Sequence, residues 1–375
     1  MTPRILYLVT EDWYFLSHRL PMARAAKAAG YEVHVATRLK DGRAAIEKEG
    51  FTPHGLSWSR GSLSPTGSVS AVFALHRLMK QLKPDIVHNV ALKPVLLGTT
   101  ASLGLRDIAV VNSLTGLGAL FVKDGGSGRL TRSIVAFALR HLLKRPRTRT
   151  VVQNPDDRRF LRDLGVPADM IVTIAGSGVD LDHLHVLPEP PPPVTAAFVG
   201  RMLRVKGVMT LIDAYKVVTS RGVKLRLLLA GDCDRENPSS LAPEQLREFA
   251  SAYGIVWLGH VDDISEVWRQ AHFAVQPSHG GEGLPKSLLE AAACGRAMVA
   301  TDVPGCREIA VEGETALTVP PGDEDALAGA MARMAEDPAM RQRFGKAARR
   351  LVERKFSAEL IGRETVALYD KLIGR

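Results

Sequence analysis

The sequence has few cysteines and few aromatic residues. Its 375 residues include three cysteines, Cys233, Cys294 and Cys306, and none lies in a C-x-x-C pair or at a spacing typical of metal ligands. Three isolated thiols make no disulfide framework, so we expect a reducing compartment, the cytoplasm. Aromatic side chains make up 6% of the residues, and no nucleic-acid-binding signature is present, so we expect no nucleic-acid partner.

Long apolar runs and phosphate-binding glycine motifs are also missing. No stretch approaches the roughly 18 apolar residues of a membrane-spanning helix, and the opening MTPRILYLVTEDW predicts a first strand rather than a signal peptide. The segment TEDWYFLSHRLP that follows contains no glycine, which argues against the G-x-G-x-x-G fingerprint of dinucleotide-binding dehydrogenases. No G-x-x-x-x-G-K-[ST] sequence occurs, which argues against a phosphate-loop NTPase.

Basic residues outnumber acidic ones by 49 to 40, which gives a net charge of +9. This excess suits a negatively charged partner, either a nucleic acid or an anionic lipid surface. Because nucleic acid is disfavoured, the lipid surface is the remaining candidate. Residues 129–150, RLTRSIVAFALRHLLKRPRTRT, contain seven basic residues and no acidic one. Apolar residues recur in this segment at helical spacing, namely Ile134, Phe137, Ala138 and Leu142. The pattern predicts a peripheral helix on an anionic membrane, or alternatively a stripe that packs on the core beside solvated arginines.

Strand and helix patterns alternate along the chain, which is typical of parallel sheets with helices on both faces. The proline-rich stretch LPEPPPPV interrupts the alternation and cannot join either sheet. We therefore expect two doubly wound, Rossmann-like α/β domains, residues 1–187 and 195–356, with a linker at 188–194. Residues 357–375 are expected to form the last helix.

Residues 277–309 concentrate the features that suggest a binding site. A glycine-rich turn leads through Pro285, which suits the first helical position, into an apolar helix at about 286–294. A buried strand is predicted at 297–301. The backbone N–H groups of residues 283–287 should then form a helix N-terminus that attracts an anion.

Two carboxylates flank this predicted helix N-terminus. Glu282 lies just before the helix, and Glu290 lies in its second turn within LLEAAACG. A carboxylate in so apolar a helix is costly unless it has a partner. A pair of sugar hydroxyls is one such partner; a backbone group or an arginine is the alternative.

A second segment upstream, FVGRMLRVKG, places two cations after a buried strand. Arg201 lies in the tight turn, and Lys206 is expected to open the next helix with its side chain facing solvent, as Arg201 does. A fork-shaped guanidinium and a point-charge ammonium suit a diphosphate. The acids Asp232 and Asp234 in DCD follow another apolar strand and resemble a metal-binding D-x-D, but we interpret them as solvated loop acids and expect no metal.

With both segments in this order, the chain resembles the family 4 retaining glycosyltransferases, which have the two-domain GT-B fold. The residues that carry the resemblance are Gly200, Arg201, Lys206 and Gly207, then Glu282 and Glu290 as an E-x7-E pair, with Gly283, Leu284 and Pro285 between them. The resemblance runs nearly end to end and includes residues 113–121, 151–165 and 176–184. The wider pattern is most similar to the PglA-like bacterial branch, which extends undecaprenyl-diphosphate-linked saccharides.

The resemblance implies roles for individual residues. It implies catalytic roles for Arg201, Lys206 and Glu282, and nucleotide-sugar contacts for Gly200, Val261, Gly283, Leu284, Lys286, Ser287 and Glu290. It also implies two domains facing a cleft, a last helix that crosses back to the first domain, and front-face transfer without metal or cofactor. Stabilising the charge on the departing diphosphate is then the main catalytic effect.

The acceptor side of the site is less defined. His18, His88 and Lys93 lie at predicted strand or helix ends that should face the cleft, although a lone histidine there is also compatible with a structural role. Many family members carry a histidine where this chain has Thr115, so the role of that histidine cannot be assigned to this position. These four residues are our acceptor-side candidates.

These observations predict a cytoplasmic enzyme, peripheral at the inner face of the membrane. It would transfer a sugar, expected to be a HexNAc, from a UDP-sugar to a lipid-diphosphate-linked saccharide. The alternatives are a nucleotide-sugar hydrolase or epimerase of the same fold, which has no need of the E-x7-E pair, and a non-catalytic scaffold subunit, which has no need of the buried charges.

Overall fold

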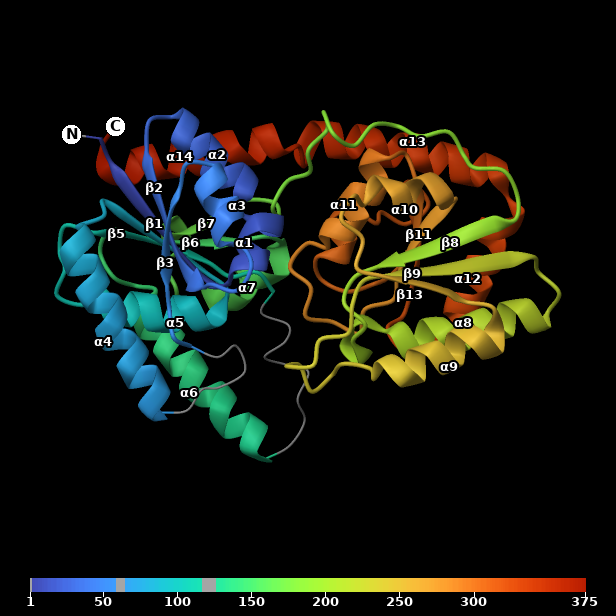
Figure 1. Cartoon of the computed structure of the whole chain (residues 1–375), viewed down its shortest axis with the longest axis horizontal. Coiled ribbons are helices and arrows are strands. Elements are labelled where there is room, and N and C mark those ends of the chain that lie inside the picture. The colour runs from blue at the N-terminus through green and yellow to red at the C-terminus, as the bar shows by residue number, and fades with distance from the viewer. Residues whose placement is uncertain (1, 59–64, 117–125) are drawn as a thin grey trace. The chain divides into compact units, whose positions relative to one another are not determined.

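The computed structural model describes residues 2–58, 65–116 and 126–375, and gives only the backbone of 65–66 and 126–131. The chain folds into two compact units (Figure 1). The first unit comprises residues 1–178 and 358–375, and the second comprises residues 179–357. Among the described residues, no helix is long and apolar enough to cross a membrane.

The first unit is built on a seven-stranded sheet with strand order β3-β2-β1-β4-β5-β6-β7. All neighbouring strands are parallel. The central strands read as buried runs such as IVHNV and AVVNS, as expected for a parallel sheet covered on both faces. The strands are β1 (Arg4–Glu11), β2 (Glu32–Arg38), β3 (Thr52–Gly55), β4 (Ile86–Val90), β5 (Ala109–Ser113), β6 (Thr148–Val152) and β7 (Ile171–Thr173).

Helices cover both faces of this sheet, and alternate side chains of β1 reach the two layers. Tyr7 packs in one hydrophobic cluster with Met22 of α2, whereas Leu6 packs in another with Leu75 of α4 and Leu97 of α5. The helical segments are α1 (Asp12–His18), α2 (Leu20–Ala28), α3 (Arg43–Lys48), α4 (Pro65–Leu82), α5 (Leu92–Ala101), α6 (Gly126–Leu142), α7 (Pro155–Asp163) and the short η2 (Ala168–Met170).

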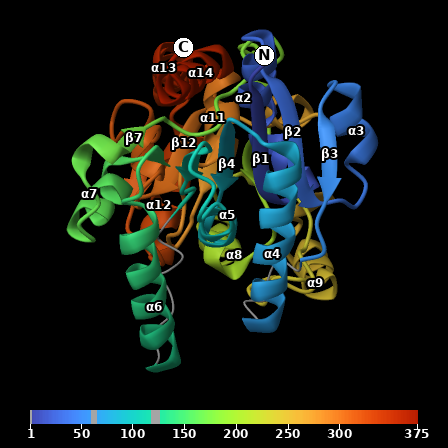
Figure 2. The ribbon, with the colours of Figure 1, turned by 90° about the vertical axis from the view of Figure 1, so that its left-hand side faces the viewer.

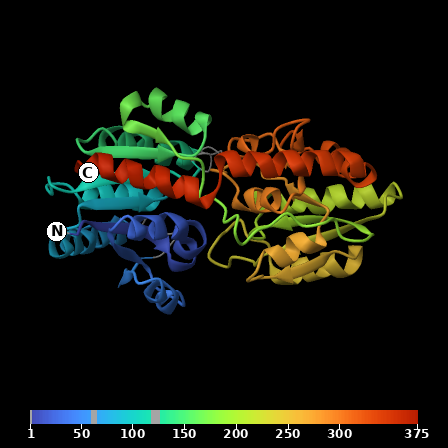
Figure 3. The same cartoon turned by 90° about the horizontal axis from the view of Figure 1, so that it is seen from above.

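The last helix of the chain, α14 (Ala358–Ile373), completes the first unit. It lies beside α2, as Figure 3 shows from above. The hydroxyl of its Tyr369 lies 2.9 Å from that of Tyr7, and Tyr31 donates a 2.6 Å hydrogen bond to Asp370. The expected return of the C-terminal helix to the N-terminal domain is therefore confirmed.

The second unit repeats the same architecture with a six-stranded parallel sheet, in the order β10-β9-β8-β11-β12-β13. One face packs on α8 and α12, and the other carries α11 and α13. The strands are β8 (Val194–Val199), β9 (Leu225–Ala230), β10 (Val256–Gly259), β11 (Phe273–Gln276), β12 (Ala297–Thr301) and β13 (Ala316–Val319). The helical segments are η3 (Arg204–Lys206), α8 (Val208–Ser220), α9 (Pro243–Tyr253), α10 (Ser265–Gln270), α11 (Lys286–Ala293), η4 (Cys306–Glu308), α12 (Glu324–Glu336) and α13 (Pro338–Lys355).

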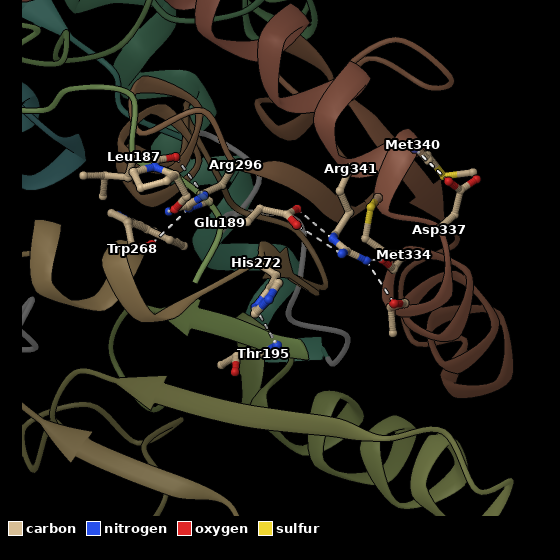
Figure 4. Close-up of polar contacts among 12 residues, drawn as sticks. Leu187, Glu189, Thr195, Trp268, His272, Arg296, Met334, Asp337, Met340 and Arg341 are labelled. Carbon is tan, nitrogen blue, oxygen red and sulfur yellow. Dashed lines mark hydrogen bonds and ion pairs between the residues drawn. The ribbon is translucent and has the colours of Figure 1, made fainter. Parts of the chain in front are cut away.

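The proline-rich segment expected as a linker is bound to the second unit (Figure 4). The buried guanidinium of Arg296 donates to the carbonyl oxygens of Trp268, Leu187 and Pro188 at 3.0, 3.1 and 2.8 Å. Arg341 donates to Glu189 at 2.8 Å and to two carbonyl oxygens of α12. The first unit ends at Gly178, before the proline-rich segment begins, and these hydrogen bonds hold residues 187–189 to the second unit.

Gly207 allows two loops of the second unit to approach each other. Its φ is +75°, and a Cβ there would lie 1.9 Å from the carbonyl oxygen of Pro277. Only glycine tolerates this combination of left-handed backbone and close backbone contact. The turn that ends at Lys206 is thereby held against the segment after β11. Lys206 itself is the last residue of η3, so it does not open the helix as we expected; α8 begins two residues later.

The contact at Gly207 can be tested against a matched glycine at the other end of α8. Gly222 has a φ of +81° but no atom within 4 Å of its would-be Cβ. We expect Gly222→Ala to cost about 1 kcal/mol through backbone strain alone, and Gly207→Ala to cost about 3 kcal/mol or more because the clash adds to it. Urea unfolding of both variants measures the difference. Equal losses would mean that the close approach is unimportant.

Candidate active site

The predicted site segments of the second unit meet at one edge of its sheet. The strand order reverses direction between β8 and β11, and doubly wound sheets bind ligands beyond the carboxyl ends of the strands at this position. Gly200 and Arg201 follow β8 directly, and Ser278 and Glu282 follow β11. The two segments therefore lie where this fold favours a ligand.

Lys206 and Glu282 form an ion pair across these two segments. The Lys206 Nζ donates to both carboxylate oxygens of Glu282, at 2.6 and 2.8 Å. Glu282 is 9% exposed, and the Ser278 hydroxyl donates to its Oε1 at 2.6 Å. A carboxylate this buried requires compensation, and Lys206 provides it. The Lys206 side chain is 25% exposed, so it faces solvent only in part rather than freely as we expected. The pair holds one positive and one negative group at the switch point.

Arg201 is also paired, although its side chain is partly exposed to solvent, as we expected. Its Nη1 donates to Oδ2 of Asp234 at 2.6 Å, with the arginine side chain 37% and the aspartate side chain 12% exposed. The second acid of the DCD sequence is therefore a counterion of Arg201, while Asp232 is exposed. Within the described ranges, no cluster of three or more His, Cys, Asp or Glu side chains could hold a metal ion.

The N-terminus of α11 lies beside this ion pair in the sequence. Pro285 is the residue before the helix rather than its first residue, and it supplies no side-chain hydrogen bond to the first amides. Gly283 and Leu284 are buried just before it. The Ser287 hydroxyl donates to Oε1 of Gln276, the last residue of β11, at 3.0 Å. An N-terminus without a side-chain cap keeps its partial positive charge available to an anion.

Glu290 lies in the second turn of α11 and is 8% exposed. Burial raises the pKa of its carboxyl above the usual value, and the nearby Lys286 ammonium opposes that rise. The Lys286 Nζ lies 3.2 Å from Oε1 of Glu290. Its partner is thus a lysine one turn earlier rather than an arginine or a backbone group. Val261, the last of the donor-side candidates, follows β10 and is partly buried.

The acceptor-side candidates all lie in the first unit. His18 stacks on Tyr14 with ring centroids 4.3 Å apart, and its Nδ1 lies 2.7 Å from the Ser17 hydroxyl. The Lys93 ammonium lies 5.8 Å from the centre of the Trp58 ring, and burial, then Arg38, lowers its pKa. Thr115 is partly buried, two residues beyond β5.

We expected His88 at the end of a strand. It lies instead in the middle of β4, where it is 2% exposed. Its Nδ1 lies 2.6 Å from the Tyr369 hydroxyl and its Nε2 lies 2.6 Å from the Ser113 hydroxyl. Burial, and secondly the charge of Arg19, hold its pKa well below the usual value. Both ring nitrogens are therefore occupied, and His88 is a neutral core residue.

Some residues of the site were not recognised from the sequence. Gln276 and Ser278 orient Ser287 and Glu282, and their only sequence signal is a polar run, QPSH, directly after a buried strand. Asp234 was interpreted as a solvated loop acid, not as the partner of Arg201. Of the similar segment at 113–121, residues 117–121 lie outside the described residues.

Comparison with known families assigns one match to each unit. Residues 4–148 match the model described as "Glycosyl transferase 4-like". Residues 193–337 match the model described as "Glycosyl transferases group 1". Together the two matches span more than three quarters of the chain, and the second contains all the donor-side residues described above.

Individual proteins resemble the chain from end to end. The N,N'-diacetylbacillosaminyl-diphospho-undecaprenol alpha-1,3-N-acetylgalactosaminyltransferase of Campylobacter jejuni is 26% identical, over 96% of this chain and 98% of that one. The structure of sucrose-phosphate synthase from Thermosynechococcus elongatus has a TM-score of 0.81 at 20% identity, covering 99% of both chains. That of Anabaena HepE in complex with UDP-glucose has a TM-score of 0.77 at 17% identity, covering 98% of this chain and 99% of that one. Two family matches, one in each unit, and full-length similarity thus show that the chain belongs to the family 4 and group 1 glycosyltransferases and has the GT-B fold.

Proposed function

We propose that this glycosyltransferase transfers a HexNAc from a UDP-sugar to a saccharide linked to a lipid diphosphate, with retention of the anomeric configuration. The observation that carries the proposal is the charge arrangement at the β8 and β11 switch point. There, Lys206 and Glu282 form an ion pair, Arg201 follows the neighbouring strand, and the N-terminus of α11 comes next in the chain.

In this proposal the two ion pairs are the resting state of a diphosphate site. Donor binding gives Arg201 and Lys206 phosphate oxygens as partners in place of Asp234 and Glu282. Charge-assisted hydrogen bonds from a guanidinium or an ammonium to phosphate are among the strong ones. Glu282, released from Lys206, can then accept hydrogen bonds from hydroxyls of the donor sugar.

The reaction proposed is front-face transfer, in which the acceptor hydroxyl enters on the face from which the diphosphate departs. Negative charge develops on the leaving oxygen, so the two cations and the amides at the start of α11 stabilise the transition state more than the ground state. Glu290 is placed to bind the ribose hydroxyl pair, which would replace solvent around a largely buried carboxylate. These groups balance the leaving charge, and the proposal therefore includes no divalent metal.

The acceptor is inferred from the relative of Campylobacter jejuni, whose name describes transfer to a diphospho-undecaprenol-linked sugar. Similarity covers 96% of this chain, including the first unit, where acceptors are expected to bind. A cytoplasmic, membrane-peripheral location follows from such a substrate. Hydrolysis or epimerisation of nucleotide sugars is not favoured, because the family matches are to glycosyltransferases.

Removing either cation tests the diphosphate site. We expect Arg201→Ala and Lys206→Ala to lower kcat/KM by about 30- to 900-fold, which corresponds to about 2–4 kcal/mol of lost transition-state stabilisation. Release of UDP from UDP-HexNAc in the presence of the lipid-linked acceptor measures the rate. Arg204→Ala is the matched control, because Arg204 is an exposed cation in the same turn as Lys206. Near wild-type rates in either site variant would refute the assignment.

Metal independence is tested by chelation. With the leaving charge balanced by Arg201, Lys206 and the α11 N-terminus, we expect turnover to persist in excess EDTA at its original rate. The same UDP-release assay measures it, with and without added magnesium or manganese. Loss of activity in EDTA that either metal restores would contradict this part of the proposal.

We further propose that α6 docks the enzyme on anionic membranes through Ile134 and Phe137, the two most exposed residues of the predicted stripe. Val135, Leu139 and Leu143 pack in the core, whereas Ile134 and Phe137 are 60% and 67% exposed. Exposed apolar and basic groups on one helix suit a lipid interface. Side chains of residues 129–131, at the start of the predicted segment, lie outside the described set.

A second helix of the first unit adds to this apolar surface. Val69 and Phe73 of α4 are 56% and 71% exposed. Among the described residues, four of the eight exposed large hydrophobic side chains belong to α4 and α6, so apolar exposure is concentrated on these helices. The two helices flank α5, as Figure 2 shows. Arg145, by contrast, belongs to the fold, because its guanidinium donates to the Thr99 carbonyl and to Ser102 at 3.1 and 2.7 Å.

Membrane docking is tested with charge-reversal pairs. We expect the double variant Arg140→Glu, Lys144→Glu to bind phosphatidylglycerol vesicles at least about tenfold more weakly than wild type, since each cation near such a surface contributes about 1 kcal/mol. Lys346→Glu with Arg350→Glu is the control, an exposed pair at the same spacing on α13 of the second unit. Co-sedimentation at low and high salt measures binding. If the α6 variant sediments like wild type, the docking surface lies elsewhere.

A further inference from the structure

Arg19, between α1 and α2, is a buried cation without a counterion. Its side chain is 2% exposed, and its Nη1 donates only to the sulfur of Met22, at 3.4 Å. Its Nε and Nη2 have no hydrogen-bond partner in the described part of the chain. No carboxylate pairs with it there. A buried guanidinium in this state needs a partner that the described residues do not provide.

The other buried arginines have hydrogen-bond partners within the protein. Arg296 donates to three carbonyl oxygens, and Arg341 to Glu189 and two carbonyl oxygens. Both lie at a junction of chain segments that they hold together. Arg19 makes no comparable contact, so a purely structural role does not account for its burial.

Arg19 lines a small cavity of the first unit. Besides Arg19, the polar part of its wall comes from His88, Ser113, Gln153 and Thr365, and none of the described residues that line it is acidic. Ser113 ends β5 and Gln153 directly follows β6, so the cavity lies toward the carboxyl ends of the strands, the edge where doubly wound sheets bind ligands. Its volume is about 10 Å³, which suits a single oxygen-sized atom, since one water needs roughly 10–15 Å³.

The neighbours of Arg19 are held in fixed positions. Ser113 is bonded to His88, His88 to Tyr369, and Tyr369 to Tyr7, at 2.6, 2.6 and 2.9 Å. This chain of hydrogen bonds joins three strands of the sheet, β1, β4 and β5, to α14. It leaves the wall rigid, with the guanidinium as its only charge. A rigid pocket with one cation, polar walls and no acid selects an anionic oxygen.

We propose that Arg19 and this pocket form a subsite for one oxygen of a phosphoryl group. Two sources could supply that oxygen: the diphosphate of the lipid-linked acceptor, which rests on the proposed function, or free phosphate or diphosphate. The guanidinium provides the charge, and the side-chain amide of Gln153 provides a further hydrogen-bond donor. Binding satisfies the two nitrogens of Arg19 that have no partner among the described residues.

The test combines thermal unfolding with kinetics. The unfolding arm uses the Arg201→Ala background, so that phosphate cannot act through that cation of the donor site. There we expect millimolar phosphate or diphosphate to raise Tm by about 3 °C or more over gluconate of equal ionic strength. Adding Arg19→Met should remove that rise. In the otherwise native chain, Arg19→Met should raise the KM for lipid-linked acceptor about tenfold, without changing the KM for UDP-HexNAc or the affinity for UDP.

The outcomes separate the possibilities. A lost Tm shift together with a raised acceptor KM identifies the acceptor diphosphate, whereas a lost Tm shift alone identifies free phosphate or diphosphate. If Arg19→Met lowers Tm equally with and without phosphate and leaves the acceptor KM unchanged, Arg19 is structural and the proposal fails. Should that variant not fold, Gln153→Leu replaces it and should reduce the same Tm shift; an undiminished shift also overturns the proposal. The unfolding arm decides the question even if no transfer to a lipid acceptor is found.

Discussion

The candidate site of the second unit depends on one close approach between two backbones. Gly207 lies against the carbonyl of Pro277, and no side chain could occupy the space between them. Lys206 reaches Glu282 because its turn lies this close to the segment after β11. Ser278 and Gln276, which belong to that segment, then orient Glu282 and Ser287. The position of the charged groups thus follows from a backbone contact rather than from the attraction between the charges.

The charged residues of the two units are compensated differently. In the second unit each cation of the site has its own carboxylate, so the site is close to neutral before a substrate arrives. An anionic ligand there must exchange partners, which favours selective binding over strong binding. In the first unit Arg19 is buried without such a partner. An anion that reaches Arg19 displaces no counterion. A small part of a substrate can then contribute much of its binding free energy.

Sequence patterns predicted the architecture because its signals are local. Buried strand runs, glycines at helix ends and the alternation of elements identified two doubly wound domains, and the returning helix was confirmed. The pairing of Arg201 with Asp234 could not be predicted, since it depends on how the loop after β9 folds back toward the end of β8. The prediction for His88 was wrong because polar residues within IVHNV are typical of the end of a strand. In the structure, long-range contacts with Tyr369 and Ser113 bury it. The division between the units was expected at a proline run, and Arg296 instead binds that run to the second unit.

The returning helix also determines the order in which the two units can be finished during synthesis. Ile361, Leu368 and Tyr369 belong to the same hydrophobic cluster as Tyr7 and Met22. The second unit is one uninterrupted segment of chain, so its core is complete once its own residues have left the ribosome. The first unit, although made first, is completed only by residues 358–375, which follow the second unit in the chain. Its α2 face therefore remains uncovered while the whole second unit is translated, and the unit made first closes after the second.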